Sequence, residues 1–245
     1  MSVHQHSLNI IVPCFNPDPG WEHKFIQYYQ DLSEKIGEGC TSLILVNDGS
    51  TTEVNDGQID RIKAIIPEMK YLQYPNNKGK GHALRTGIQN SKSEFTIFTD
   101  VDFPYETDSV VEVYRQLCNG TDIVLGYREQ DYYAKVPLFR KLLSKGLRWV
   151  LKSLLKLSIT DTQCGLKGFN ESGKKLFLAT TIDRFLFDLE FVMLSSKDTT
   201  ISTAPVLVKL REGVIFSKVN MKVLLVELAN LFVLTFYKRK PSPHA

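Results

Sequence analysis

The stretch EFTIFTDVDFPY, residues 94–105, joins a short apolar run to two carboxylates. The run from Phe95 to Phe98 is almost wholly apolar rather than alternating, so it predicts a strand buried on both faces, as in a parallel sheet covered by helices. Asp100 and Asp102 follow it directly. Because charged groups are costly to place beside a buried strand, their presence at its end indicates a site.

Runs of the same kind recur along the chain. They predict strands at residues 9–15, 42–48, 70–75, 94–100, 122–128 and 202–210. The first five alternate with segments of helical spacing at Trp21–Ile36, Ile59–Ile66, Gly81–Asn90 and Ser109–Cys118. This order predicts an α/β fold with a mostly parallel central sheet and helices on both faces. Ligands of such sheets bind beyond the carboxyl ends of the strands, where we expect Asp48, Asp100 and Arg128.

The character of the chain changes after Arg128. Residues 135–157 hold seven Lys or Arg and no acidic residue, and 174–195 predict a further helical region. Residues 220–237 predict a last apolar helix before a polar tail. We therefore expect one domain over 1–219 with a functional division near residue 130, followed by the helix and tail at 220–245.

The composition limits the classes of protein. The chain has 245 residues, 43% of them hydrophobic and 23% charged, which is typical of a folded α/β domain. A net charge of +3 gives no reason to expect a nucleic-acid partner. The four cysteines are scattered, which argues against a disulfide framework or a zinc site and favours a reducing compartment. We expect neither a signal peptide nor a spanning helix, since no run of about 18 apolar residues occurs.

The segment LVNDGSTTE, residues 45–53, places polar residues directly after a strand. One interpretation is a plain strand-to-helix turn, which Asn, Asp and Gly all favour. The other is that Asp48 accepts hydrogen bonds from a nucleotide base or ribose. The residues alone leave both open.

The segment NNKGKGHALRTGI, residues 76–88, begins a predicted helix with two glycines and two lysines. Glycines let backbone N–H groups approach an anion, and a helix N-terminus favours negative charge. The spacing is that of neither a P-loop nor a dinucleotide fingerprint. We expect a loop on the phosphate side of a ligand, with an ordinary loop as the alternative.

Asp100 and Asp102 lie two residues apart, so on an extended backbone both point to one side. Mg²⁺ and Mn²⁺ prefer oxygen ligands and often use one or two carboxylates together with substrate phosphates. We therefore expect one divalent ion here. The alternative is that one aspartate caps the turn before Pro104 and the other is solvated.

Residues 138–157 carry a basic stripe at helical spacing, with leucines over much of the remaining surface. Such a helix suits an anionic membrane surface, the alternative being a surface helix with a solvated basic edge. The helix at 220–237 is expected to lie in the membrane interface, or to pack on the domain or on a second copy in a homodimer. We expect a cytoplasmic protein attached to the cytoplasmic face of a membrane without spanning it.

Seven segments together carry a family resemblance. They are IIVPCFNP (10–17), LVNDGSTTE (45–53), NKGKGHALRTGI (77–88), FTDVDFP (98–104), LGYR (125–128), DTQCGLKGF (161–169) and FLFDLEFV (185–192). In this order they resemble family 2 glycosyltransferases of the GT-A fold. More narrowly, they resemble the polyprenyl-phosphate branch of dolichyl-phosphate β-glucosyltransferases and mannose synthases. DTQCG is close to the glucosyltransferase form.

The resemblance implies a nucleotide-sugar donor, with UDP-glucose favoured, one divalent ion and inversion at the anomeric carbon. It implies a nucleotide-sugar half at residues 1–130 and an acceptor half at 131–219. By position, the implied site residues are Pro13, Phe15 and Asp48 at the nucleotide, Lys80 near its phosphates, Asp100 and Asp102 at the metal, Arg128 and Arg140 at the acceptor phosphate, and Asp161, Gln163 and Glu190 at the sugar and acceptor.

Two points stay open. A further metal ligand that some relatives carry is replaced by Pro104, which has no donor oxygen in its side chain. The acceptor is expected to be a polyprenyl phosphate, which needs arginines to hold it but no strong base. The alternative is a hydroxyl acceptor in glycan assembly, which would need a base from Asp161, Asp188 or Glu190.

Overall fold

The computed structural model describes residues 6–37, 39–128 and 164–212. Its first part alternates strands and helices: β1 (Leu8–Cys14), α1 (Trp21–Ile36), β2 (Thr41–Asp48), α2 (Asp56–Ile65), β3 (Lys70–Tyr74), α3 (Lys80–Gln89), β4 (Phe95–Phe98), α4 (Thr107–Cys118) and β5 (Ile123–Tyr127). The second part contains β6 (Lys167–Phe169), α6 (Glu171–Leu178), α7 (Phe187–Lys197) and β7 (Thr203–Leu207).

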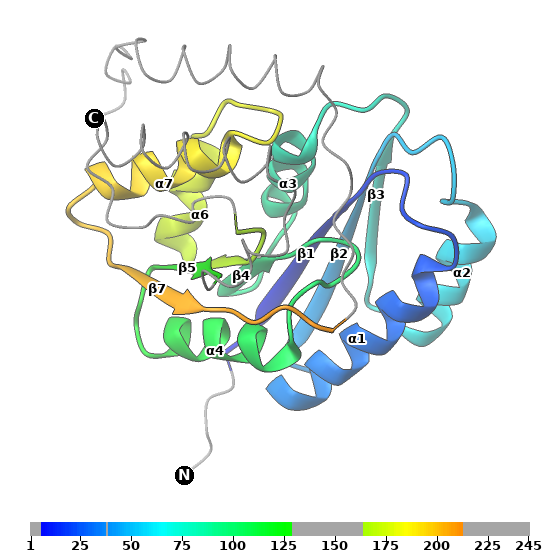
Figure 1. Cartoon of the computed structure of the whole chain (residues 1–245), viewed down its shortest axis with the longest axis horizontal. Coiled ribbons are helices and arrows are strands. Elements are labelled where there is room, and N and C mark those ends of the chain that lie inside the picture. Colours follow the sequence, from blue (N-terminus) through cyan, green and yellow to red (C-terminus); the bar gives the residue numbers. More distant parts are fainter. Residues whose placement is uncertain (1–5, 38, 129–163, 213–245) are drawn as a thin grey trace.

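The strands form one seven-stranded sheet in the order β3-β2-β1-β4-β6-β5-β7 (Figure 1). Every pairing is parallel except those of β6, which runs antiparallel between β4 and β5. The expected α/β fold with a mostly parallel sheet is confirmed, as is each of the six predicted strands. β6 was not predicted.

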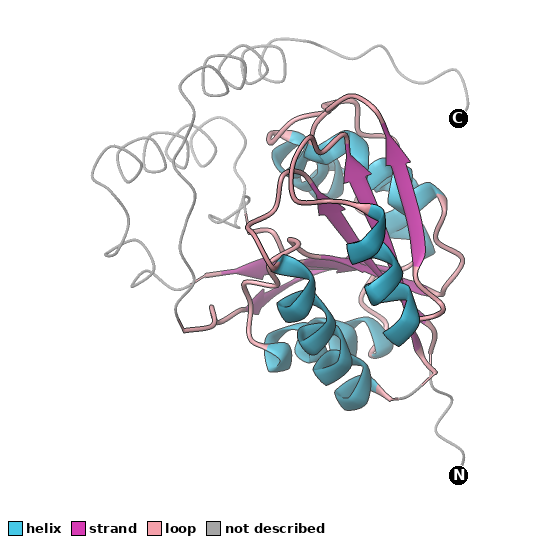
Figure 2. Ribbon diagram, turned by 90° about the vertical axis from the view of Figure 1, so that its right-hand side faces the viewer, coloured by secondary structure: helices cyan, strands magenta, loops and turns pink. Residues whose placement is uncertain are grey.

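Helices cover both faces of the sheet, as the side view shows (Figure 2). One core lies between the sheet and α1, α2 and α4, and includes Phe25, Ile62 and Val113. The other lies between the sheet and α3, α6 and α7, and includes Leu84 and Phe187. Neighbouring strand residues point into opposite cores, as expected of strands buried on both faces.

The helices differ most from the predictions in two places, whereas the bounds of α3 and α4 differ by one or two residues. α2 begins at Asp56 rather than Ile59, because Asn55 and Gln58 form a capping box in which each side chain bonds the other's backbone N–H. The region 174–195 is two helices, α6 and α7, rather than one. The amphipathic helices expected within 135–157 and at 220–237 lie outside the described residues. None of the described helices is long and apolar enough to cross a membrane.

A buried ion pair lies at the start of β6. The Lys167 ammonium, whose side chain is fully buried, is 2.8 Å from the carboxylate of Asp188 on α7. It also donates to the carbonyl of Cys164 at 2.5 Å and lies 5.7 Å from the centre of the Phe98 ring. Burial raises the pKa of Asp188, and the charges of Lys167 and Lys80 oppose the rise. The pair ties β6 and α7 to the segment that precedes β6.

We predict that Lys167→Met lowers the free energy of unfolding by about 3–5 kcal/mol, because it leaves a buried carboxylate without its partner. Denaturant unfolding measures this change. The double variant Lys167→Met/Asp188→Leu should recover part of the loss, since an apolar pair of similar volume carries no desolvation penalty.

Lys35→Met is the matched control. Lys35 pairs with Asp108 at 3.0 Å on the surface, where screening makes such pairs weak, so a small change is expected. An equal loss in Lys167→Met and Lys35→Met would contradict the prediction.

Candidate functional site

The polar residues that follow the parallel strands lie at one edge of the sheet. Asp48 ends β2, Lys80 begins α3 just after β3, and Asp100 and Asp102 follow β4. Arg128 follows β5 and is half-buried. The structure therefore brings these five residues to the carboxyl edge, as the order of strands predicts.

The loops at this edge are joined to one another. The Asn16 side-chain oxygen accepts from the backbone of Thr51 at 2.8 Å and of Thr52 at 3.2 Å, linking the loop after β1 to the loop after β2. Gly49 has a φ of +69°, and a Cβ there would lie 2.6 Å from the backbone of Asn76 and Asn77. Only glycine allows this approach, so the loop after β3 packs against the loop after β2.

Asp48 is a structural anchor in this geometry. It is 3% exposed, and its carboxylate accepts from the Lys78 N–H at 2.8 Å, the Gly79 N–H at 2.9 Å and the Asn77 side chain at 2.8 Å. The carboxylate thus holds the loop before α3 on the end of β2. Its predicted contact with a nucleotide stays a prediction.

Four backbone N–H groups at the start of α3 already have partners within the chain. Beyond the two N–H groups bound by Asp48, those of Gly81 and His82 donate to the carbonyl of Asp183 at 2.7 and 3.2 Å. Arg85 fixes the same segment by donating to Ile182 and Thr180. Other parts of the chain thus already bind these four amides, so the expectation of a loop on the phosphate side of a ligand rests on Lys80 and stays a prediction.

Lys80 instead faces the carboxylates. Its ammonium lies 2.5 Å from an Asp100 carboxylate oxygen. Burial opposes the charge on Lys80, but Asp100, Asp188 and Asp102 outweigh it and raise its pKa. Lys80 is therefore a fixed positive charge at the point where the acidic pair gathers.

Asp102 completes the acidic pair from a strained turn. Surrounding protein and the charge of Asp100 raise the pKa of Asp102 to about 6, although its side chain remains partly open to solvent. The next residue, Phe103, has a φ of +42°. A left-handed backbone at a bulky residue costs roughly 1–2 kcal/mol, so the surrounding structure must hold this turn in place.

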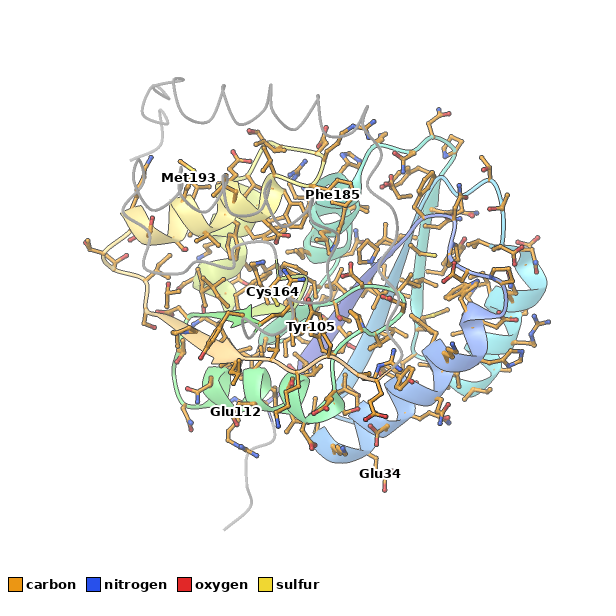
Figure 3. All side chains as sticks on the ribbon, viewed as in Figure 1. Glu34, Tyr105, Glu112, Cys164, Phe185 and Met193 are labelled. Atoms are coloured by element: carbon orange, nitrogen blue, oxygen red, sulfur yellow. The ribbon has the colours of Figure 1, made fainter. Side chains whose placement is uncertain are left out.

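Sequence reasoning missed the residues that press on Asp100 from the other side. Gly165 donates its N–H to the Tyr105 hydroxyl at 2.8 Å, and Cys164 lies beside the same ring (Figure 3). A Cβ on Gly165 would lie 2.5 Å from the Asp100 carboxylate. Gly165 is the glycine of the DTQCG motif quoted above. A glycine within such a motif could have signalled that another part of the chain approaches its backbone closely.

The donor set fits a hard divalent ion. Two carboxylates lie within one turn, and Asp102 is raised in pKa partly by its acidic neighbour, so a cation between them would relieve the repulsion. The described residues contain no group of three acidic, His or Cys side chains that could hold a metal. An ion here would therefore complete its ligands with phosphate oxygens and water. The presence of Pro104 where some relatives carry a further metal ligand is consistent with this.

The remaining predicted residues differ in their surroundings. Pro13 is buried inside β1, whereas the Phe15 ring just beyond it is 47% exposed at the site edge. Glu190 accepts from the backbone of Thr181 at 2.7 Å and Ile182 at 2.9 Å, so it holds the segment that meets α3. Arg140, Asp161 and Gln163 lie outside the described residues.

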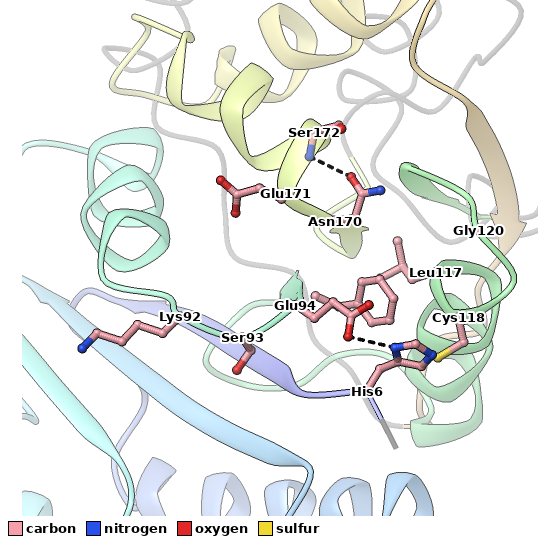
Figure 4. Close-up of a pocket in the computed structure, with 11 residues that line it drawn as sticks. His6, Lys92, Ser93, Glu94, Leu117, Cys118, Gly120, Asn170, Glu171 and Ser172 are labelled. Atoms are coloured by element: carbon pink, nitrogen blue, oxygen red, sulfur yellow. Dashed lines mark hydrogen bonds and ion pairs between the residues drawn. The ribbon is translucent and has the colours of Figure 1, made fainter. Parts of the chain in front are cut away.

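A cavity of about 540 Å³ lies at the opposite edge of the sheet (Figure 4). His6 and Glu94, 2.8 Å apart, line it together with Asn170, whose side chain caps α6. These residues lie at the amino ends of the parallel strands. Among the predicted site residues that the structure describes, none borders this cavity, so it is distinct from the acidic site.

Comparisons with known proteins agree with this geometry. The model of the family described as glycosyl transferase family 2 matches residues 9–177. Dolichyl-phosphate beta-glucosyltransferase ALG5A of Trichomonas vaginalis is 27% identical over 199 residues, covering 78% of this chain and 61% of the relative. Dolichyl-phosphate beta-glucosyltransferase of Dictyostelium discoideum is 28% identical over 205 residues, covering 78% and 62%. The chain thus spans somewhat less than two thirds of these relatives.

A solved structure shares the fold. It is the mannosyltransferase PcManGT from Pyrobaculum calidifontis in complex with GDP-Man and Mn²⁺, with a TM-score of 0.62 and 14% identity, covering 98% of this chain and 67% of that one. The GT-A expectation for the fold is confirmed.

We predict that Gly165→Ala weakens Mn²⁺ binding about tenfold or more while changing the thermal unfolding midpoint little. The added methyl group meets the mobile end of the Asp100 side chain, which must move away from its position, and displaced ligand supports typically cost 10–100-fold in metal affinity. Titration with Mn²⁺, followed by calorimetry, measures the affinity.

Gly57→Ala is the control for this substitution. A Cβ at Gly57 makes an ordinary contact of 3.4 Å with the Asn55 side chain and meets neither Asp100 nor Asp102. Unchanged Mn²⁺ affinity in Gly165→Ala would contradict the placement of Asp100 in a metal site.

Proposed function

The chain belongs to glycosyl transferase family 2, and we propose that it transfers a hexose, glucose from UDP-glucose by first choice, to the phosphate of a polyprenyl lipid. The observation that carries the proposal is the meeting of Asp100, Asp102 and Lys80 at the carboxyl edge of the sheet. The names of the curated relatives support the lipid phosphate and the glucosyl group.

A divalent ion, Mg²⁺ or Mn²⁺, is part of the proposal, with Asp100 and Asp102 as its protein ligands. Such an ion supplies a Lewis acid for the negative charge that develops on a diphosphate leaving group. The Mn²⁺ and GDP-Man in the structure of the Pyrobaculum mannosyltransferase support an ion of this kind. Lys80, already at the carboxylates, provides a second positive charge for the donor phosphates.

The donor would lie across the joined loops. Phe15 offers an exposed ring beyond β1, where a base can stack, and Asp48 fixes the loop that leads to Lys80. Pro13, buried within β1, is proposed to lie beneath the nucleotide. The inverting displacement then needs the acceptor on the face of the sugar opposite the diphosphate.

Two of the three residues that could activate a hydroxyl acceptor already bind other groups of the protein. Asp188 is buried in its ion pair with Lys167, and Glu190 accepts from the backbone at Thr181 and Ile182. A phosphate monoester has a second pKa of about 6 and needs no strong base. These commitments support the phosphate acceptor over a hydroxyl acceptor, which remains the alternative through Asp161.

The lipid phosphate is proposed to be held by Arg140 of the acceptor half, residues 131–219, together with Arg128 just after β5, with Asp161, Gln163 and Glu190 near the sugar. Arginine suits this task because its guanidinium binds phosphate oxygens in pairs. We place the enzyme on the cytoplasmic face of a membrane, attached through the basic stripe of 138–157. Residues 220–237 are proposed to lie on the membrane or against a second copy.

A donor panel tests the proposal. We predict that purified protein with Mg²⁺ or Mn²⁺ and a short polyprenyl phosphate consumes UDP-glucose in preference to UDP-galactose, UDP-N-acetylglucosamine and GDP-mannose. The product should carry a sugar–phosphate linkage, measured by mass spectrometry and phosphorus NMR. A sugar linked to a hydroxyl group would favour the alternative, and no transfer from any donor would contradict both.

We further predict that Arg128→Ala lowers kcat/KM for the lipid phosphate at least a hundredfold, while the affinity for the nucleotide sugar changes little. The reason is that removing a charged hydrogen-bond donor from a phosphate typically costs several kcal/mol, and each 1.36 kcal/mol is a tenfold change. Arg115→Ala on the exposed face of α4 is the matched control. Normal transfer by Arg128→Ala would refute the acceptor role.

A further inference from the structure

Arg211, just beyond β7, reaches the turn that carries the acidic pair. Its Nε donates to the carbonyl of Phe103 at 2.5 Å, and its Nη2 donates to the carbonyl of Asp102. The guanidinium lies over the Tyr28 ring on α1, 3.4 Å from its centre. Two neighbouring carbonyls are thus gripped by one planar cation that is itself stacked on an aromatic face.

The turn that Arg211 grips is the strained one. Phe103 holds its φ of +42° while its side chain is 4% exposed. Its ring packs edge-on against Phe25 at 5.5 Å and stacks with Tyr28 at 6.4 Å. The core therefore fixes the ring, and the Phe103 N–H bonds the Asp100 carbonyl at 3.0 Å. Arg211 binds the carbonyl of the same peptide group, that of Asp102, and the carbonyl of Phe103 in the next one.

The backbone around Arg211 holds the following residues as well. The Arg211 N–H donates to the Pro104 carbonyl at 3.0 Å, and the Glu106 N–H donates to the Lys209 carbonyl at 2.9 Å. Tyr105 and Leu210 form an antiparallel bridge between them. The segment after β7 thus acts as a short added strand along the segment after the acidic pair.

We propose that Arg211 is a positioning residue, which keeps the Asp102–Phe103 backbone in its left-handed turn so that the Asp100 and Asp102 carboxylates face one divalent ion. The presence of the ion rests on the proposed function, whereas the contacts of Arg211 are observed in the structure. Without the guanidinium, the Phe103 backbone relaxes toward negative φ and carries the Asp102 side chain away from Asp100.

The test is a double-mutant cycle on Mn²⁺ affinity, measured by calorimetry and electron paramagnetic resonance. Arg211→Ala should weaken Mn²⁺ binding about 10–100-fold, the range seen when supports of ligands are removed. Arg211→Lys, which keeps the charge but cannot bind both carbonyls, should recover only a small part of it. Arg115→Ala, an exposed arginine on α4, should leave the affinity unchanged.

The second arm of the cycle uses Phe103→Gly. Glycine adopts positive φ without strain, so Arg211→Ala should weaken Mn²⁺ binding less in the Phe103→Gly background than in the native one. A general loss of packing would instead give the same fold-change in both backgrounds. Equal fold-changes, or unchanged Mn²⁺ affinity in Arg211→Ala, would overturn the proposal.

Amide hydrogen exchange without metal separates this inference from the function. In Arg211→Ala, exchange should accelerate at residues 101–106 more than in α2 or α3. If the native protein binds no Mn²⁺, the metal part of the proposed function has failed, and this comparison decides whether Arg211 holds the turn. Uniform exchange across the chain would overturn it. Arg211→Lys provides the same readout if Arg211→Ala does not fold.

Discussion

Two carboxylates held two residues apart at the end of a buried strand repel each other. Much of the carboxyl edge keeps them in place or offsets their charge. Lys80 places an ammonium 2.5 Å from Asp100, yet burial and then the charge of Asp100 still raise the pKa of Asp102 to about 6. A fold does not need this arrangement, because a turn can be capped by one aspartate. The acidic pair therefore supports the proposed cation and anionic donor.

The neighbouring charges are also fixed through the backbone of the loops that carry them. Asp48 holds the loop that carries Lys80, and the Asp183 carbonyl holds the first turn of α3. Lys167 holds the carbonyl of Cys164, next to Gly165, where an added Cβ would meet the Asp100 carboxylate. Rigid supports of this kind suit a site that must meet a diphosphate in one geometry, because they reduce the reorganisation needed on binding.

The sequence predicted what local patterns encode. Apolar runs gave six strands, and helical spacing gave α1 to the residue, since both depend on neighbours in the chain. β6 was missed because three residues starting with a lysine have no strand pattern; they become a strand only between β4 and β5. Arg211 carried no signal, because its partners lie 108 and 109 residues away. The break between α6 and α7 likewise depends on Glu190 and Arg85, which bind its backbone.

These distant partners change the meaning of the division near residue 130. A nucleotide-sugar half that ended there would lack β6, which separates β4 from β5 in the sheet. It would also lack Gly165 against Asp100, the Asp183 carbonyl at α3 and Arg211 at the acidic turn. The later segments therefore supply contacts that hold the proposed donor side of the site. The division separates proposed roles along the chain. The physical unit is the whole sheet, because β6 lies between β4 and β5 and the segment after β7 holds the turn of the acidic pair.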